Sequence, residues 1–313
     1  MATSAPVRRQ SATRPDPADA SAGSCLGSRD LLPLLAADPE RLGPVRILCR
    51  LPPGGQGCDV FLGELRSCDG RRGPVVVVKR LPAECDRPTR RLFAREIAVA
   101  SLIRSERVPA VVHVDLGAAA PYYVQAFAPG APLSELLQQR GGRLGAEETR
   151  TIAVEVLRAL VDLDDCGVVH GDVKPGNLVV SDTRVWLVDL GLGRLIGSDD
   201  TGLLAQRGTK HYASPEHFRI DGTLGPASDL FAWGLVVART AAGRHPVDPA
   251  LLLNDRDYYR ALTAGAPDLW PLTGALRAAV SRALSPDPAD RGTARQLLDQ
   301  LECHSVPAPT AGG

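Results

Sequence analysis

The hydrophobic pattern of this chain changes near Gly130, and this change limits the fold more than any other feature. Before it, short apolar runs punctuated by glycine and proline predict strands of an antiparallel sheet at residues 45–51, 59–65, 74–81, 110–116 and 122–127. After it, the spacing of amphipathic helices recurs at residues 133–140, 146–165, 228–243, 273–284 and 293–302. We therefore expect an α+β fold with a small β-rich lobe, a larger α-helical lobe and a ligand in the cleft between them.

The ends of the chain differ in composition from this central part. Residues 1 to about 30 are rich in Ala, Ser, Pro, Asp and Arg and lack hydrophobic periodicity. We assign residues 1–40 to a disordered or weakly ordered tail, and residues 304–313 to a flexible C-terminal tail. Residues 41–303 are then expected to form one domain.

Charge and cysteine content exclude several classes of function. The 313 residues include 36 Lys or Arg and 36 Asp or Glu, so no overall field favours nucleic acid or anionic lipid as a partner. The seven cysteines include no C-x-x-C pair, which argues against a zinc site or a disulfide framework and favours a cytoplasmic location. No stretch reads as a membrane helix or a secretory signal.

A glycine-rich turn, LPPGGQGCDVF at residues 51–61, joins the first two predicted strands. Gly54, Gly55 and Gly57 lack a Cβ, so their backbone N–H groups can approach phosphate oxygens closely. A plain hairpin turn explains the same residues equally well.

Lysine is scarce in this chain, and its three lysines are Lys79, Lys174 and Lys210. Lys79 closes the apolar run 75–78, where a buried charge is costly unless a partner is close. Glu96 is the natural partner, because it lies on a predicted helix at residues 87–103. That helix has one apolar face, formed by Leu92, Ile97 and Ala100. The alternative is a lysine that reaches solvent from the end of a strand.

Two further segments carry polar groups next to apolar runs. HGDVKPGN, residues 170–177, gathers Asp172, Lys174 and Asn177, although the chain has only two asparagines. A solvated turn is the alternative explanation. In VWLVDLGLG, Asp189 ends an apolar strand, and its carboxylate is the kind of ligand that a hard cation prefers.

Taken in this order, these segments resemble the motifs of protein kinases, and specifically of bacterial eukaryotic-like (Hanks-type) serine/threonine kinases, over about residues 41–303. Asp172 to Asn177 is similar to D-x-x-x-x-N, and Asp189 begins D-L-G in place of D-F-G. The turn departs from G-x-G-x-x-G-x-V, because Pro52 replaces the first glycine and an extra residue precedes Val60. The resemblance implies a bilobal protein kinase fold with lobes at about 41–127 and 128–303.

The resemblance also implies ATP and Mg²⁺ as cofactors, with Mn²⁺ as an alternative metal. Asp172 would be the general base, Lys174 would neutralise the transferred phosphoryl group, and His170 would support the loop. Asn177 and Asp189 would hold the metal ion. The residues implied for nucleotide binding are Gly54, Gly55, Gly57, Val60, Lys79, Glu96, Ala126, Phe127 and Ala128, with Gln125 as gatekeeper.

The motif H-G-D also resembles small-molecule kinases of the aminoglycoside phosphotransferase type, which remain an alternative. Three features favour a protein substrate. GTKHYASPE, residues 208–216, resembles a substrate-docking segment in which Thr209 would contact Asp172 and favour Ser or Thr substrates. Asp229 would brace the 170–177 loop, and Arg291 would pair with Glu216. A pseudokinase scaffold is a third possibility, suggested only by the irregular turn.

Gly171 stands where kinases regulated by loop phosphorylation carry an arginine that pairs with the phosphate. Ser198 and Thr201 are candidate phosphorylation sites in that loop, but this receiver is absent. We therefore expect activity to depend little on loop phosphorylation.

Overall fold

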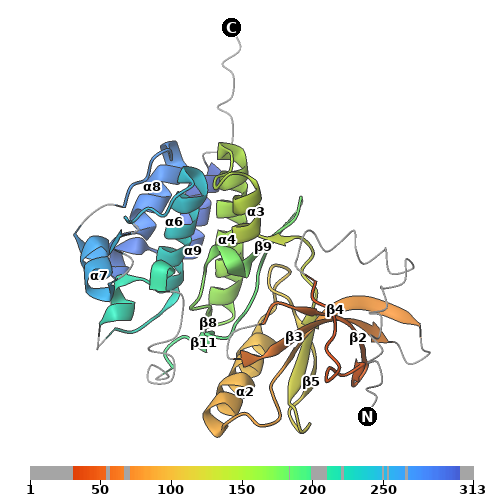
Figure 1. Cartoon of the computed structure of the whole chain (residues 1–313). Helices are drawn as coiled ribbons and strands as arrows, with labels where there is room; N and C mark the ends of the chain where they lie inside the picture. Colours follow the sequence, from red (N-terminus) through yellow and green to blue (C-terminus); the bar gives the residue numbers. More distant parts are fainter. Residues whose placement is uncertain are drawn as a thin grey trace, which may run out of the picture.

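The computed structural model describes residues 31–53, 57–66, 71–182, 184–198, 210–219, 222–248, 250–251, 254–264 and 267–303. They form a β-rich lobe and an α-helical lobe (Figure 1). This is the two-lobe α+β organisation that the sequence predicts.

The smaller lobe is an antiparallel sheet with strand order β1-β2-β3-β4-β6-β5. Its strands are β1 (Arg41–Leu42), β2 (Val45–Leu51), β3 (Asp59–Arg66), β4 (Arg72–Arg80), β5 (Val111–Asp115) and β6 (Tyr122–Ala126). Helix α2 (Arg87–Leu102) begins where Asp86 accepts a hydrogen bond from the backbone N–H of Thr89 at 2.8 Å. The helix packs Phe93 and Ile97 in one cluster with Tyr123 of β6. Leu92, Ile97 and Ala100, the apolar face that the sequence predicts, are all buried.

The larger lobe is organised around helices α4 (Ala146–Asp165) and α6 (Pro226–Ala242), which contact each other. The fully buried Trp233 joins them by donating its indole N–H to the carbonyl of Ala153 at 3.0 Å. The other helices are α3 (Leu133–Gln139), α7 (Asp255–Thr263), α8 (Gly274–Ala283) and α9 (Ala294–Cys303). The sequence pattern did not predict α7, because this helix buries only Tyr258 and Leu262.

Short strands hold the two loops that carry the candidate polar groups. β7 (Ala131–Pro132), β9 (Leu178–Val180) and β10 (Val185–Leu187) form one small sheet, and β8 (Val168–Val169) pairs with β11 (Arg194–Leu195) in another. Short 3-10 turns are η3 (Pro175–Asn177), η4 (Lys210–Tyr212), η5 (Pro215–Phe218) and η7 (Pro288–Arg291). The 170–177 loop therefore runs between β8 and β9, and Asp189 follows β10.

Part of the segment assigned to the N-terminal tail contacts the sheet. The backbones of Leu32 and Arg50 exchange hydrogen bonds of 3.0 and 2.9 Å, and Nη1 of Arg50 lies 3.3 Å from Oδ1 of Asp38. The part of the chain that packs on the sheet thus begins before residue 41. Within the described ranges, every helix is too short or too polar to span a bilayer.

Candidate active site

A cavity of about 300 Å³ lies between the lobes. Its apolar lining comes from the sheet, from the segment after β6 and from β9, and includes Leu51, Val60, Val77, Ala126, Ala128 and Val179. Its charged and polar lining residues are Lys79, Gln125, Glu135, Asn177 and Asp189. An apolar slot with a few convergent polar groups fits a small ligand that carries both a flat ring and charge.

Lys79 is the centre of a buried ionic cluster. Its Nζ lies 2.8 Å from Oε1 of Glu96 and 2.7 Å from Oδ1 of Asp189. The hydroxyl of Tyr123 donates to the same Glu96 oxygen at 2.6 Å. Burial alone lowers the pKa of Lys79, but Glu96, Tyr123 and Asp189 together raise it well above its usual range. The lysine is therefore held as a cation, and the contact with Glu96 expected from the sequence is present.

Asp189 is held in an unusual backbone conformation. Its φ of 69° makes it the one non-glycine residue with positive φ among those described, a conformation that is costly for most side chains. Lys79 is the main cause of a lowered pKa, about 2, for this carboxyl. Asp189 is thus ionised at neutral pH and faces the cavity from the α-helical lobe.

The 170–177 loop brings three polar side chains together. Nζ of Lys174 lies 2.6 Å from Oδ2 of Asp172. Nδ2 of Asn177 donates to the backbone carbonyl of Asp172 at 2.8 Å and to its Oδ2 at 3.0 Å. Since the amide nitrogen of Asn177 is used in this way, the amide oxygen is the atom that can serve a cation.

A buried aspartate and a buried histidine fix this loop from below. Asp229 of α6 accepts the backbone N–H of His170 at 2.7 Å and that of Gly171 at 2.8 Å. The ring of His170 is fully buried, and its Nδ1 accepts the N–H of Asp172 at 3.2 Å. His170 and Asp229 thus lie where the resemblance implied, beneath the loop.

Arg291 and Glu216 form a second buried ion pair farther from the cavity. Two guanidinium nitrogens of Arg291 lie 2.7 and 2.9 Å from the two carboxylate oxygens of Glu216. Ser228 of α6 donates to the same carboxylate at 2.7 Å. This pair ties η5 to η7 and to α6.

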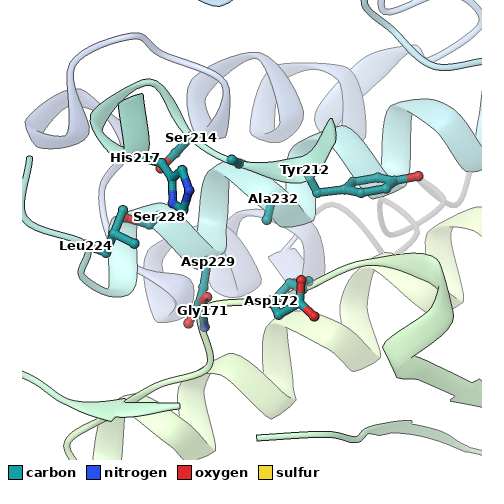
Figure 2. A pocket seen from close by; sticks show the side chains of 11 residues that line it. Gly171, Asp172, Tyr212, Ser214, His217, Leu224, Ser228, Asp229 and Ala232 are labelled. Carbon is teal, nitrogen blue, oxygen red and sulfur yellow. Dashed lines mark hydrogen bonds between the residues drawn. The ribbon is translucent and has the colours of Figure 1, made fainter. Parts of the chain in front are cut away.

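A smaller cavity of about 30 Å³ lies on the other side of the 170–177 loop (Figure 2). Gly171 and Asp172 border it from the loop, and Ser214 and His217 border it from η5 and the residue before it. The buried hydroxyl of Ser214 makes no hydrogen bond to any part of the chain that the structure describes.

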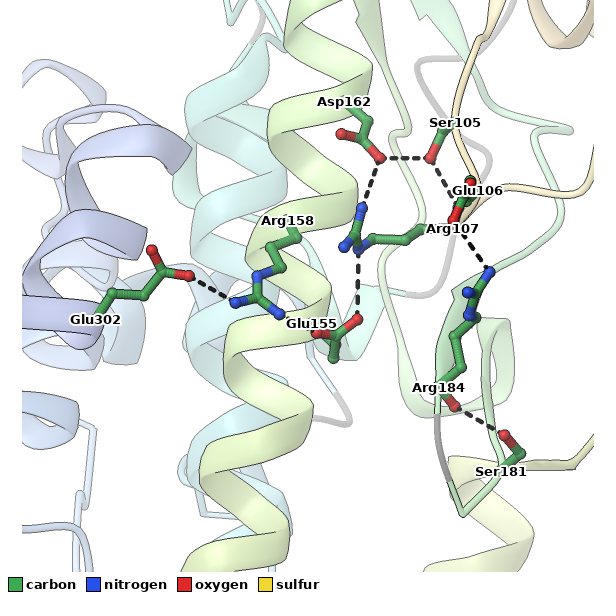
Figure 3. Close-up of polar contacts among 9 residues, drawn as sticks. All are labelled: Ser105, Glu106, Arg107, Glu155, Arg158, Asp162, Ser181, Arg184 and Glu302. Carbon is green, nitrogen blue, oxygen red and sulfur yellow. Dashed lines mark hydrogen bonds and ion pairs between the residues drawn. The ribbon is translucent and has the colours of Figure 1, made fainter. Parts of the chain in front are cut away.

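The loop that follows α2 is tied to the α-helical lobe by a polar network (Figure 3). Ser105 donates to Asp162 of α4 at 2.5 Å, and Arg107 lies 3.3 Å from Glu155 and 3.4 Å from Asp162. The carbonyl of Arg107 accepts the N–H of Leu187, the last residue of β10, at 2.8 Å. The two lobes are therefore joined close to β10, the strand that precedes Asp189.

Some residues suggested by the sequence are not brought to the cavity, or cannot be placed. Gly54, Gly55 and Thr209 lie outside the described residues. Gly57 is described and has a φ of 70°. Phe127 packs in the cluster of Leu51, Val60, Leu62 and Val77 and does not line the cavity as Ala126 and Ala128 do. The sequence reasoning missed Tyr123, although its register opposite Lys79 in the sheet follows from pairing the two strands.

Comparison with known proteins gives a consistent result. Residues 60–301 match the family described as protein kinase domain. The chain is 34% identical over 275 residues to the probable serine/threonine-protein kinase PkwA of Thermomonospora curvata, and the aligned region covers 86% of this chain and 35% of PkwA. It is 32% identical over 270 residues to the serine/threonine-protein kinase AfsK of Streptomyces coelicolor, covering 85% of this chain and 32% of AfsK. The chain spans about a third of the length of these curated relatives.

Proposed function

The chain belongs to the protein kinase family, and from this premise we propose that it transfers the γ-phosphoryl group of ATP to serine or threonine hydroxyls of protein substrates. The observation that carries the proposal is that Lys79, Asn177 and Asp189 line one cavity between the lobes, while Asp172 is hydrogen-bonded to Asn177 beside it. These residues come from β4, from the 170–177 loop and from the end of β10, so only the folded chain assembles them.

Lys79, Asn177 and Asp189 in the cavity between the lobes fit a nucleotide with a divalent cation. Protein kinases use ATP with such a metal ion, and we propose Mg²⁺, with Mn²⁺ as an alternative. Within the described ranges, no group of three or more His, Cys, Asp or Glu side chains could hold a metal ion. The oxygens of Asp189 and Asn177 would therefore share the ion with phosphate oxygens and water, as is usual for Mg²⁺.

Each polar residue has a distinct chemical role in this proposal. Lys79, oriented by Glu96, binds phosphate oxygens. Asp172 accepts the proton of the substrate hydroxyl as general base, and Asn177 and Lys174 hold its carboxylate in place. Lys174 stabilises the negative charge of the group in transit. Bound ATP supplies the phosphoryl group, and the metal ion supplies further positive charge on the phosphates.

The substrate class is supported by the segment around Glu216. The ion pair with Arg291 fixes η5, which borders the small cavity beside Asp172. A substrate peptide docked along this segment would present its hydroxyl to Asp172. Curated relatives named as serine/threonine-protein kinases support Ser and Thr as acceptors.

The proposal is tested by incubating the chain with labelled ATP, Mg²⁺, a generic protein substrate and, separately, an aminoglycoside. We expect label on Ser and Thr residues, located by mass spectrometry, and none on the aminoglycoside. Asp172→Asn should lower the rate by about 10²–10⁴-fold. Asp182→Asn, an exposed aspartate in the turn between β9 and β10, is the matched control and should keep the parent rate. Label on the aminoglycoside alone, or an unaffected Asp172→Asn variant, would exclude the proposal.

A further inference from the structure

The segment that precedes β1 is held against the sheet by polar contacts. Its leucines are largely exposed, by 44, 41, 37 and 59% for Leu31, Leu32, Leu34 and Leu35. Since exposed apolar surface contributes little stabilisation, these side chains do not hold the segment in place. Its anchor is Asp38, whose side chain is only 2% exposed. Oδ2 of Asp38 accepts the N–H of Leu35 at 2.7 Å, and Oδ1 lies 3.3 Å from Nη1 of Arg50 in β2.

Arg50 connects this anchor to the base of the glycine-rich turn. The turn joins Leu51, the last residue of β2, to Asp59, the first residue of β3. Nη1 of Arg50 lies 3.3 Å from Oδ1 of Asp59, and Nη2 donates to the same oxygen. Oδ2 of Asp59 accepts a hydrogen bond from Nη2 of Arg80 in β4 at 2.7 Å. Burial works to raise the pKa of Asp59, but hydrogen bonds and charge from Arg80 and Arg50 hold it below its usual value, so this carboxylate is ionised at neutral pH.

A buried phenylalanine holds the two arginines in place. The guanidinium carbons of Arg50 and Arg80 each lie 5.1 Å from the ring centroid of Phe61, which is fully buried. The face of an aromatic ring attracts a guanidinium, so both arginines are kept where they meet Asp59. The alternating charges of Asp38, Arg50, Asp59 and Arg80 therefore form one network across β2, β3 and β4.

The strands that this network joins also line the nucleotide cavity. Leu51 and Val60 pair with each other next to the glycine-rich turn, and both line the cavity between the lobes. Lys79, which precedes Arg80 in β4, lines it as well. The four charged residues of the network lie outside this lining. They can therefore act on a ligand in the cavity only through the strands that they hold together.

We propose that Asp38 is a positioning residue for nucleotide binding, which acts through Arg50 and Asp59 on the base of the glycine-rich turn. Residues 31–40 then belong to the ATP site, although they precede the part of the chain that matches the kinase family, residues 60–301. The inference rests on the nucleotide-binding part of the proposed function and adds a segment to its site. Without Asp38, Arg50 loses one of its two carboxylate partners, and the ends of the turn are held less firmly against a bound nucleotide.

The test measures the Kd of ATP with Mg²⁺ by calorimetry, and kcat and KM with a peptide substrate, for the parent chain, Asp38→Ala, Arg50→Met and the double variant. In Asp38→Ala we expect Kd and KM for ATP to rise about three- to tenfold, whereas kcat and the KM for the peptide stay within about twofold. Arg50→Met should raise the Kd at least as much. Because Asp38 acts through Arg50, adding Asp38→Ala to Arg50→Met should change the Kd by less than about twofold. Two effects that multiply in the double variant would overturn the inference.

Asp115→Asn is the matched control. Asp115 is a partly buried aspartate of the same lobe that accepts the backbone N–H groups of Gly117 and Ala118 at 3.1 and 2.9 Å. It therefore organises a turn, as Asp38 does, but lies outside the network. Its variant should bind ATP with the parent Kd, and a rise equal to that of Asp38→Ala would overturn the inference.

Melting curves are recorded for every variant. If Asp38→Ala does not fold, Asp38→Asn decides, because it keeps an acceptor for the N–H of Leu35 and removes only the charge that faces Arg50. A Kd raised about twofold or more in the asparagine variant supports the inference, and the parent Kd overturns it. A parent that binds ATP but transfers no phosphoryl group overturns the proposed function alone, since the Kd values still test the inference. A parent that binds no ATP overturns both.

Discussion

Replacing Arg291 by methionine should destabilise the fold by about 3–5 kcal/mol, the usual cost of leaving one partner of a buried ion pair alone. Arg291 is fully buried, and besides Glu216 its guanidinium donates to the backbone carbonyls of Ser285, Ala227 and Pro286 at 2.8, 2.9 and 3.0 Å. Methionine replaces the bulk of the side chain but none of these hydrogen bonds. The charge of Glu216 would then be buried with Ser228 as its one side-chain donor among the described residues.

The size of this effect makes it measurable by thermal unfolding. For a domain of this size, each kcal/mol lowers Tm by about 2–4 °C, so a fall of roughly 6–20 °C is expected near pH 7. Although burial works to raise it, hydrogen bonds and charge from Arg291 hold the pKa of Glu216 below its usual value. The pair thus stabilises the fold above the ordinary glutamate pKa, and this contribution is lost as pH falls through the lowered pKa.

An exposed ion pair serves as the control for the buried pair of Arg291 and Glu216. Arg158 pairs with Glu302 at 2.7 Å, but both side chains are about 40% exposed, so Arg158→Met should cost less than about 1 kcal/mol (Figure 3). In Arg291→Met, the defect should shrink toward pH 4, because a protonated Glu216 carries no unpaired charge. A loss no larger than that of Arg158→Met, or one independent of pH, would refute this reasoning.

Three further predictions each concern one site. Tyr123→Phe removes the hydroxyl that donates to Glu96, so the KM for ATP should rise about two- to tenfold, and unchanged steady-state kinetics would speak against an orienting role. Asp164→Asn should raise the free energy of unfolding by about 1–2 kcal/mol after solvent screening at pH 8, measured as a higher Tm, but not at pH 4. Burial raises the pKa of the Asp164 carboxyl to about 6, so only its ionised form is costly in the fold. Equal shifts at both pH values would contradict that assignment. Ser198→Ala/Thr201→Ala should turn over a peptide at the parent rate, and a hundredfold loss would show that loop phosphorylation is required.

Most of the regular structure could be predicted from the sequence, because long buried elements repeat their apolar residues at a regular spacing. The predicted helix at residues 146–165 coincides with α4, which buries residues along its whole length. Helix α7 escaped prediction for the opposite reason: it buries two residues, and charge dominates the rest. The pairing of Leu32 with Arg50 was missed because it consists of backbone hydrogen bonds, which leave no mark in residue type.

The candidate site was predictable where a residue type is chemically out of place. A lysine after a run of valines requires a counter-charge, and this requirement pointed to Glu96. Tyr123 gave no such signal, because a tyrosine in a β-strand is ordinary. Its contact with Glu96 depends on how β6 and α2 pack.

The sequence by itself determined the order of the elements and the identity of the polar groups, since periodicity and residue chemistry are local properties. Only the tertiary structure decided which of these groups meet: Lys79 reaches Asp189 across 110 positions of the chain. It also changed the meaning of Gly171. In the sequence this glycine is read as a missing arginine, whereas in the fold its positive φ and the carbonyl oxygen of Leu192, 2.9 Å from where a Cβ would lie, disfavour any side chain. Backbone conformation and available volume at one residue are set by segments distant in sequence, so no local pattern records them.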